Sequence, residues 1–538
     1  MAGLAAAFGS GAMTNSVEEI ERADCIFIIG SNTSVAHPLV ATRVYRAKAR
    51  GAKLIVADPR RIPIVLQADL HLRQNLGTDV ALINGLMHII LKREWHDRPF
   101  IDERTENFEA LRAVIEEYTP ERVSEITGIA VADLERAAEW YSTAERATIL
   151  YTMGITQHTT GVDNVKSLAN LAMFTGNMGR ESTGVNPLRG QNNVQGACDL
   201  GGLPNVYPGY QPVTDGNVRK KFEEAWGAKL SDTVGLTVTE MLPAALDGRV
   251  KALVVLGENP VVSDPDSLHV EKALKAVDFL LVIDIFRTPT AELADVVLPG
   301  TSFAEKDGTF TNTERRVQMV RKAIEPLGDS KPDWEIIQEL SSRFGYPMDF
   351  DSPQAIQDEI AKLTPSYGGI TYNRLQGEGL QWPCPDADHP GTKFLHQGRF
   401  ARGKGLFHAI EYKPPAEDVD EEYPFQLTTG RLYVHYHTGT MTRNSPSLDR
   451  EVKECFLEMN PADAADLGIG DGEMVTIASR RGSVATKIKL TKAVDERVVF
   501  MPFHFLESRA NILTNPAHDP IAKIPEYKVC AVRIEKLS

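Results

Sequence analysis

The densest group of residues suited to binding chemistry is Gly184–Asp199, which reads GVNPLRGQNNVQGACD. It combines three glycines, a proline, five side-chain amides and one arginine, Arg189. The stretch has too little apolar surface for a core strand, and its glycines disfavour a helix. We predict a loop that brings N–H groups and amides to a polar ligand, with Arg189 as a fixed cation for an anion. The alternative is an Asn-rich surface loop, which a second glycine loop just upstream, Thr175–Gly179, makes less favoured.

Two pairs of apolar runs each end in a glycine or an acid, and we expect these runs to position those residues as the tips of strands. The runs cover 23–30, 53–58, 250–257 and 278–284, and they end in Gly30, Asp58, Gly257 and Asp284. Short runs of this kind are typical of parallel strands buried on both faces. In each pair a glycine turn is followed by an acid at the tip of the next strand, 28 residues later in the first pair and 27 in the second. This pattern suits backbone contact to a phosphate and an aspartate on a ribose or base edge.

The repeat of this spacing favours a ligand with two nucleotide parts. Taken singly, each half could also be a plain α/β turn with no ligand. An NAD site has weak support, because neither half carries G-x-G-x-x-G and Gly9-Ser-Gly11 follows no strand.

The rest of the chain supplies helices, further strands and a different last module. Helices are predicted at 79–92 and 131–142, and strands at 148–154 and 294–302. Gln157 and His158 follow the strand at 148–154, and a lone histidine there is more often structural than catalytic. A connection rich in Gly, Pro and acids runs from about 365 to 423. From Phe425 short alternating strands predict a barrel-like all-β module.

Polar residues gather in this last module near its start, middle and end. They are Arg431, Tyr433, His435, Tyr436, His437, Asn511, Tyr527 and Lys528. His435 and His437 have a spacing that could ligate a metal, but no third ligand is evident, so we expect hydrogen bonds to an organic cofactor instead.

Composition excludes several classes of protein. A net charge of −15 argues against nucleic acid as a partner. No apolar run reaches about 18 residues, so no transmembrane helix is expected. The five cysteines are isolated, which offers neither an iron–sulfur motif nor a zinc knuckle and favours a reducing compartment, the cytoplasm.

The run NPLRGQNNVQGACD, followed by LPNVYPGY at 203–210, closely resembles the catalytic subunits of molybdenum or tungsten formate dehydrogenases, within the molybdopterin oxidoreductase (dimethyl sulfoxide reductase) family. The resemblance covers essentially the whole chain. It implies an α/β fold with two Rossmann-like parallel-sheet domains, at 1–190 and 191–400, and a C-terminal β-barrel of the double-psi type at 415–538. The second α/β domain is expected to be incomplete, with its N-terminal strands missing.

The resemblance also implies a cofactor, a molybdenum or tungsten ion held by two molybdopterin guanine dinucleotides. One dinucleotide is lined by Gly30, Asn32, Asp58, Gly77 and Asp79, with Gly154 and Gln157 near the pterins. The other is lined by Gly257, Glu258, Asn259, Asp284, Ser302 and Asp333, although Asp333 could equally be a helix N-terminal acid. The barrel closes over both through Arg431, His435, Asn511, Tyr527 and Lys528.

For activity, the resemblance implies oxidation of formate to carbon dioxide. Arg189 matches the arginine that orients formate, and Gln191 is its near neighbour. A guanidinium suits this task because it holds a carboxylate bidentately and stays charged at any working pH. Electrons are expected to leave through iron–sulfur or flavin subunits.

Three family features are absent from the chain: the four-cysteine [4Fe–4S] domain, the metal-bound cysteine or selenocysteine, and the histidine beside it. In the family pattern the last two lie a few residues before Ala2-Gly3-Leu4. A selenocysteine codon read as a stop would explain a start at Met1, and we hypothesise such a truncation. The chain on its own is then expected to expose a sheet edge, to aggregate and to lack formate oxidation activity.

Two other interpretations stay open. The chain could be a non-catalytic, cofactor-binding scaffold in an electron-transfer complex, although a scaffold has no physical need for Arg189. Within the enzymes, a related molybdopterin oxidoreductase such as a nitrate reductase is the alternative; the Arg189 loop and the closing Pro525–Lys528 favour formate dehydrogenases.

Overall fold

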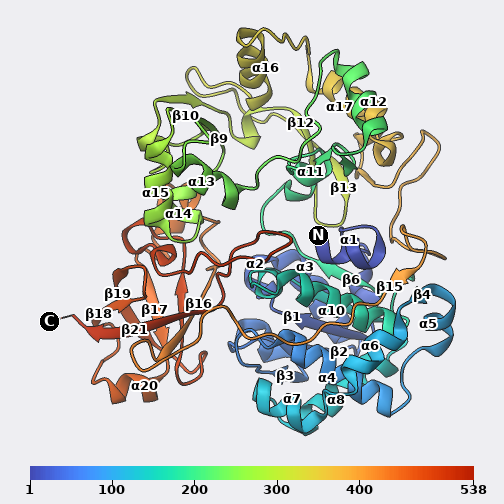
Figure 1. The fold of residues 1–538 in the computed structure, drawn as a ribbon, viewed down its shortest axis with the longest axis vertical. Coiled ribbons are helices and arrows are strands. Elements are labelled where there is room, and N and C mark those ends of the chain that lie inside the picture. Colours follow the sequence, from blue (N-terminus) through green and yellow to red (C-terminus); the bar gives the residue numbers. More distant parts are fainter. Residues whose placement is uncertain (538) are drawn as a thin grey trace. The chain divides into compact units, whose positions relative to one another are not determined.

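The computed structural model describes residues 1–537, which form two compact units (Figure 1). The first unit holds residues 1–190, 262–267 and the chain from 394 onward. The second holds 191–261 and 268–393. No helix among the described residues is long and apolar enough to cross a membrane.

The first unit is built on a five-stranded sheet of order β3-β2-β1-β5-β6 in which every pair is parallel. Its strands are β1 Cys25–Ile29, β2 Lys53–Ala57, β3 Leu70–Leu72, β5 Ala147–Tyr151 and β6 Val185–Pro187. All five residues of β1 and all five of β5 are buried. Continuous apolar runs in these central strands are what a parallel sheet covered on both faces requires.

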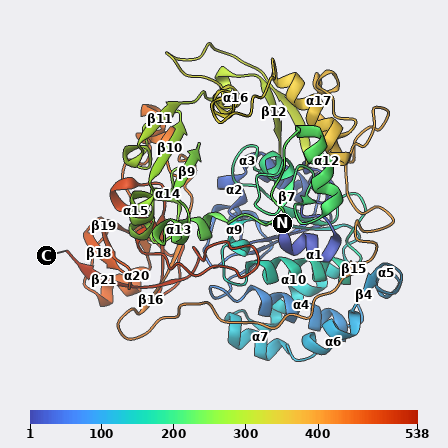
Figure 2. The ribbon, with the colours of Figure 1, turned by 45° about the horizontal axis from the view of Figure 1, so that its top comes forward.

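Helices cover both faces of this sheet. On one face α4 Asp79–Lys92, α8 Val131–Thr143 and α10 Gly161–Phe174 share a core with Phe27 and Ile29. On the other face α3 Pro38–Ala49 packs over Ile26 and Ile28. Figure 2 shows α4 and α10 side by side, with α1 Ala2–Phe8 along α10. The remaining longer helices are α5 Arg98–Arg104, α6 Phe108–Ile115 and α7 Pro120–Thr127.

The first unit also contains a closed six-stranded barrel, orange to red in Figure 1, of order β16-β20-β17-β19-β18-β21. Its strands are β16 Phe425–Gly430, β17 Phe456–Met459, β18 Met474–Ala478, β19 Ser483–Leu490, β20 Val498–Pro502 and β21 Cys530–Lys536. Strict alternation of exposed and buried residues along β19 gives the barrel its core. The short alternating strands expected from Phe425 onward form this barrel, although β17 has only four residues, too few to show a period.

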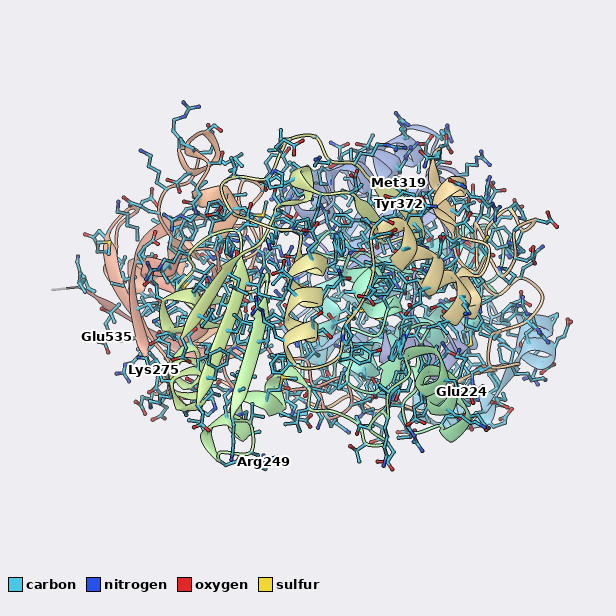
Figure 3. All side chains as sticks on the ribbon, turned by 90° about the horizontal axis from the view of Figure 1, so that it is seen from above. Glu224, Arg249, Lys275, Met319, Tyr372 and Glu535 are labelled. Atoms are coloured by element: carbon cyan, nitrogen blue, oxygen red, sulfur yellow. The ribbon has the colours of Figure 1, made fainter. Side chains whose placement is uncertain are left out.

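The second unit contains a three-stranded parallel sheet of order β11-β10-β9. The strands are β9 Ala252–Leu256, β10 Phe279–Asp284 and β11 Val296–Pro299. Helices α13 Val238–Leu246 and α15 Ser267–Ala276 share one core with β10, and α16 Asp333–Arg343 covers the other face of β10. In Figure 3, Arg249 lies just before β9 and Lys275 lies on α15. Other elements are α11 Val194–Asp199, α12 Gly216–Trp226, α17 Pro353–Leu363, β12 Gly308–Thr311 and β13 Arg316–Val320.

The predicted fold class, parallel α/β sheets with a C-terminal β-barrel, is confirmed. The predicted helix at 79–92 matches α4, and that at 131–142 extends by one residue.

One local prediction was wrong. The 184–199 run is not all loop, because β6 and α11 occupy its two ends. Asn186 is tolerated in the buried strand because its amide donates to Thr148 Oγ1 at 2.8 Å, so burial leaves that donor satisfied.

Candidate functional site

In the first unit a cavity lies at the carboxyl ends of the parallel strands, where α/β sheets bind ligands. Its walls are the turns after β1, β2, β3, β5 and β6, together with residues of the barrel. Nine residues predicted to bind the cofactor line it: Gly30, Asn32, Asp58, Gly77, Asp79, Gly154, Gln157, Arg431 and Lys528.

The bottom of the cavity is formed by two glycine turns that lie close together. Gly30 has φ +56°, and a Cβ there would lie 2.7 Å from the carbonyl carbon of Gly154. A Cβ on Gly154 would lie 2.6 Å from Gly30 O. The turns are joined by hydrogen bonds from Gly154 N and Thr152 Oγ1 to Gly30 O, at 3.0 and 2.8 Å. Neither position has room for a side chain, so the backbone itself is presented to a ligand.

Acceptor groups gather at the β2–β3 end of the cavity. Asp58 follows β2, and Gln74 and Asp79 follow β3. Burial raises the pKa of Asp58 to about 6 and, with a smaller effect of the Asp58 charge, that of Asp79 to about 7. Gln74 Nε2 donates to Asp79 Oδ1 at 3.3 Å, which turns its Oε1 away from that carboxylate. Buried carboxylates with such pKa values favour a ligand that supplies N–H donors.

Cationic groups come from the barrel side and from the turn after β2. Lys528 Nζ donates to Thr429 O at 2.6 Å. Burial, with smaller effects of Arg431 and Arg60, lowers the pKa of Lys528 to about 7. Arg60 pairs with Glu458 at 2.7 Å and stacks 3.3 Å from the centre of the Phe500 ring. A bound anion would favour the charged form of Lys528 and so strengthen its own binding.

Several buried polar atoms of lining residues have no hydrogen-bond partner among the described residues. They are Asn32 Oδ1, His37 Nδ1, Arg60 Nε, Gln74 Oε1 and His158 Nδ1. An unsatisfied buried polar atom costs about 1–3 kcal/mol, and folded proteins rarely keep one without a reason. Five in one cavity, drawn from the turns after four different strands, fit a polar ligand that spans the sheet edge.

Arg189 lies two residues after the end of β6, at the other end of the same edge. Leu188 N donates to Tyr151 O at 2.9 Å, and Arg189 Nη2 donates to Gly11 O at 3.4 Å. Leu188 and Gly190 line the cavity on either side of Arg189. The arginine is half-buried, so it avoids the full desolvation penalty of a buried cation.

The second unit holds its own set of strand-end residues. Gly257 follows β9, Asp284 ends β10, and Ser302 follows β11. Burial, with a smaller effect of Asp333, raises the pKa of Asp284, so the two carboxylates are neighbours. Asp333 also pairs with Lys306, and the Cβ of an alanine at Gly300 would lie 2.8 Å from Asp333 Oδ1.

Other predicted residues of the second unit also have protein partners. Asn259 Oδ1 accepts from Thr290 Oγ1 at 2.7 Å, and Ser302 forms a capping box with Glu305. Glu258 and Gln191 belong to this unit as well, beside Gly257 and at the start of the unit. Asp284 is partnered too, because its Oδ1 accepts from Ile285 N and Phe286 N at 2.7 and 3.1 Å.

Three predicted barrel residues do not line the first-unit cavity as described. Both ring nitrogens of His435 are engaged within its own segment, with Thr442 Oγ1 and Val452 O. Asn511 Nδ2 donates to Val262 O and Ser263 O at 2.8 Å, and Tyr527 hydroxyl donates to Ser263 O at 2.9 Å. These side chains hold the 262–267 segment to the first unit.

Sequence reasoning missed Gln74, Arg60 and His37 as lining residues. Arg60 stood in the Pro-Arg-Arg turn after β2, and Gln74 in the polar Arg-Gln-Asn turn after β3, so strand position was the usable signal. His158, expected to be structural, is buried with Nε2 2.9 Å from Gly154 O, and it also lines the cavity. Among the described residues no group of three or more His, Cys, Asp or Glu side chains could hold a metal.

Comparisons with known proteins match nearly the whole chain. Residues 3–343 match the family model described as Molybdopterin oxidoreductase, and residues 425–531 match that described as Molydopterin dinucleotide binding domain. The F420-dependent formate dehydrogenase subunit alpha of Methanocaldococcus jannaschii is 54% identical over 539 residues, 99% of this chain and 80% of that protein. Formate dehydrogenase H of Escherichia coli is 41% identical over 546 residues, 100% of this chain and 76% of that protein.

A solved structure supports the fold alone. Acetylene hydratase from Pelobacter acetylenicus superposes with a TM-score of 0.81 at 20% identity, covering 100% of this chain and 80% of that one.

Proposed function

Since this chain belongs to the molybdopterin oxidoreductase family, we propose that it is the catalytic part of a formate dehydrogenase that oxidises formate to carbon dioxide. The cofactor is two molybdopterin guanine dinucleotides carrying molybdenum or tungsten. The proposal rests on the first-unit cavity. It is lined by predicted cofactor residues, by the residues that hold five buried polar atoms without a hydrogen-bond partner among the described residues, and by Leu188 and Gly190 on either side of Arg189. Relatives named as formate dehydrogenases cover 99% and 100% of the chain.

The order of groups along the sheet edge sets the direction in which a dinucleotide lies. Acceptors of Asp58, Gln74 and Asp79 stand at the β2–β3 end, and they suit the N–H groups of a guanine base. The Gly30–Gly154 floor presents bare backbone in the middle, beside the Lys528 ammonium, which suits phosphates. The β5–β6 end, with Gln157 and Arg189, is left for the pterin and the reaction. Strands about 4.8 Å apart place these ends roughly 19 Å from each other.

When bound, the metal group supplies a two-electron acceptor for formate. Arg189 holds the formate carboxylate, because a guanidinium fork matches both oxygens and stays charged. Holding the substrate in one orientation converts an encounter into a positioned reaction, and the fixed cation stabilises charge that shifts during it. Unit 2 contributes Gly257, Asn259, Asp284, Ser302 and Asp333 to the second dinucleotide, with Glu258 and Gln191 near them.

The finer assignments form part of the same proposal. A cysteine or selenocysteine from a segment outside these residues would ligate the metal, and a [4Fe–4S] cluster there would pass electrons to iron–sulfur or flavin subunits. The compartment is the cytoplasm. The domains are 1–190, 191–400 and 415–538, the second of them completed by strands outside the chain.

The test is cofactor content and formate binding in the chain purified from a host that makes the guanine dinucleotide cofactor. We expect GMP released by acid from wild-type protein, a loss of at least tenfold in a Asp58→Asn, Asp79→Asn double variant, and unchanged GMP in Arg189→Ala. Broadening of the [13C]formate signal should disappear in Arg189→Ala and persist in Arg61→Ala, an exposed neighbour of the cavity wall. Wild-type protein without GMP, or formate broadening that survives Arg189→Ala, contradicts the proposal.

A further inference from the structure

His37 connects the cavity to the loop of Arg189. It ends the turn after β1, lines the cavity, and places Nε2 2.6 Å from the main-chain oxygen of Arg189. The two residues are 152 positions apart in sequence, so the contact ties the β1 turn to the β6 turn across the sheet edge.

The chemistry of this contact determines the protonation of the ring. A carbonyl oxygen can only accept, so Nε2 must carry the hydrogen, and in the neutral ring Nδ1 then carries a lone pair. Burial, together with the nearby Arg431, lowers the pKa of His37, while the bond to Arg189 O opposes that shift. The neutral form therefore prevails at neutral pH, and Nδ1 is a buried acceptor with no hydrogen-bond partner among the described residues.

Local helix structure does not account for this side chain. His37 is the residue before α3, with φ −140°, but its side chain makes no capping hydrogen bond, and Pro38 begins the helix. A Ser, Asp or Asn would cap α3 better. The imidazole is used across the sheet edge instead.

The loop that receives this bond is held closely on its other sides. Leu188 N donates to Tyr151 O, which sets the chain before Arg189. A Cβ on Gly190 would lie 2.9 Å from both Arg431 Nη2 and Met153 Cε, so the chain after Arg189 is wedged against two lining residues. The Arg189 carbonyl between them is fixed by His37. If that hydrogen bond were lost, the main chain at Arg189 could rotate, and the guanidinium at the end of its side chain would move with it.

We propose that His37 is a positioning residue for Arg189: its Nε2–H fixes the Arg189 carbonyl while its Nδ1 accepts a hydrogen bond from the ligand in the cavity. Occupation of the cavity then orders the Arg189 loop, so formate is held well only when the cofactor is in place. The inference rests on the proposed function, because it takes Arg189 as the formate residue and the cavity as the cofactor site.

The test compares His37→Gln, whose amide can both donate and accept, with His37→Leu, which can do neither. His71→Leu is the matched control, because His71 Nε2 likewise binds a main-chain carbonyl, Asp58 O at 2.9 Å, at the far end of the same edge. Each protein is purified from a host that makes the cofactor and from one that does not. Amide hydrogen exchange of peptides covering 186–193 and acid-released GMP are then measured.

In wild-type protein we expect cofactor to slow exchange of the 186–193 amides about tenfold, the factor that one good hydrogen bond supplies. His37→Gln should keep most of that slowing. His37→Leu should lose it at equal GMP content, and His71→Leu should retain it. In [15N]histidine-labelled wild-type protein without cofactor, the His37 signals should show the Nε2–H form, and filling the cavity should shift Nδ1 as it accepts a bond.

The outcomes separate the two ideas. Bound GMP with equal slowing in wild-type and His37→Leu overturns the coupling and leaves the proposed function standing. An Nδ1–H ring in the cofactor-free protein overturns the coupling too. No GMP in wild-type protein overturns both.

Discussion

The two parallel sheets repeat one arrangement of three strands and differ in what lies beside it. In the first unit the order is β3-β2-β1, and in the second it is β11-β10-β9. Gly30 and Gly257 follow the equivalent strands β1 and β9 with φ +56° and +60°. Each donates its N–H to the residue just before the acid at the tip of the neighbouring strand. Gly30 N donates to Ala57 O at 3.0 Å, and Gly257 N donates to Ile283 O at 2.8 Å.

Beyond these three strands the sheets diverge. β1 is flanked on its other side by β5, so all its residues are buried. β9 is the edge of the sheet as described, and its Val254 and Leu256 are 62% and 46% exposed. On the same face, Ile336 and Leu340 of α16 pack with Leu281 and Ile283 of β10 and with Leu298 of β11. Parallel strands are normally covered on both faces, so β9 is an unusual apolar edge that invites pairing with another chain.

The comparison separates two kinds of information in the chain. The glycine turn and the acid at the next strand tip are local features, and they form in both sheets whether or not a fourth strand is present. Closure of the ligand site is not local. Gly154 approaches Gly30 within contact distance, whereas a Cβ on Gly257 would meet nothing within 4 Å. A half-site can be recognised from its own residues, but its walls depend on what pairs with β1 or β9.

The largest expected difference comes from placing a charge at the equivalent position of β1 and β9. Phe27 and Val254 each stand three residues before the glycine turn, with 1% and 62% exposure. Phe27→Lys buries an unpaired ammonium in the core and should lower the free energy of unfolding of the first unit by about 4 kcal/mol or more. Val254→Lys should change that of the second unit by no more than about 0.5 kcal/mol and should reduce aggregation.

Hydrogen exchange along a denaturant series reads the two units separately, and light scattering reports aggregation. Equal destabilisation by the two lysines would show that β9 is covered in solution, and the contrast between the sheets would then be lost.

A smaller difference is expected at the two glycines. Gly30→Ala forces a Cβ to 2.7 Å from Gly154 at a positive φ, which should cost roughly 3 kcal/mol of unfolding free energy. Gly257→Ala meets no neighbour and should cost about 1 kcal/mol, the backbone term alone. Thermal unfolding monitored by exchange in each unit gives both values. If Gly257→Ala lowered the free energy of unfolding as much as Gly30→Ala, a further group would have to contact the β9 turn in solution.

Sequence alone predicted the parts of this comparison that are local. The runs ending at Gly30, Asp58, Gly257 and Asp284 form strands that end at that residue or one residue before it, because continuous apolar runs bounded by a glycine or an acid have few other solutions. The helix at 79–92 was equally clear, since it is apolar along most of its length and begins with an acid.

The cavity wall could not be predicted in the same way. His37 meets Arg189 across 152 residues and Arg60 meets Glu458 across 398, and no spacing rule links such partners. Gln74 is one polar residue among three in its turn, and only the fold selects it. The Arg189 loop was recognised as a binding segment from its composition, but the strand and helix at its ends depend on Thr148 and on tertiary packing that composition does not record.

The smallest expected effect concerns the acids at the strand tips and their response to pH. Burial raises the pKa of Asp79 to about 7, against an ordinary value near 3.9, so the folded first unit holds a proton that the unfolded chain has already released. Stability from this group is therefore fully present below about pH 4 and is lost as the pH rises toward 7. Asp79→Asn should remove that slope, which is at most about 1.4 kcal/mol per pH unit, in protein without cofactor. Asp284→Asn should do the same more weakly in the second unit, where burial also raises the pKa but leaves the carboxyl half-exposed.

Urea unfolding followed by hydrogen exchange at pH 4.5 and 7.5 measures both slopes. If Asp79 made the wild-type first unit more stable at the higher pH, the interpretation of Asp58 and Asp79 as buried, partly protonated carboxylates would be wrong.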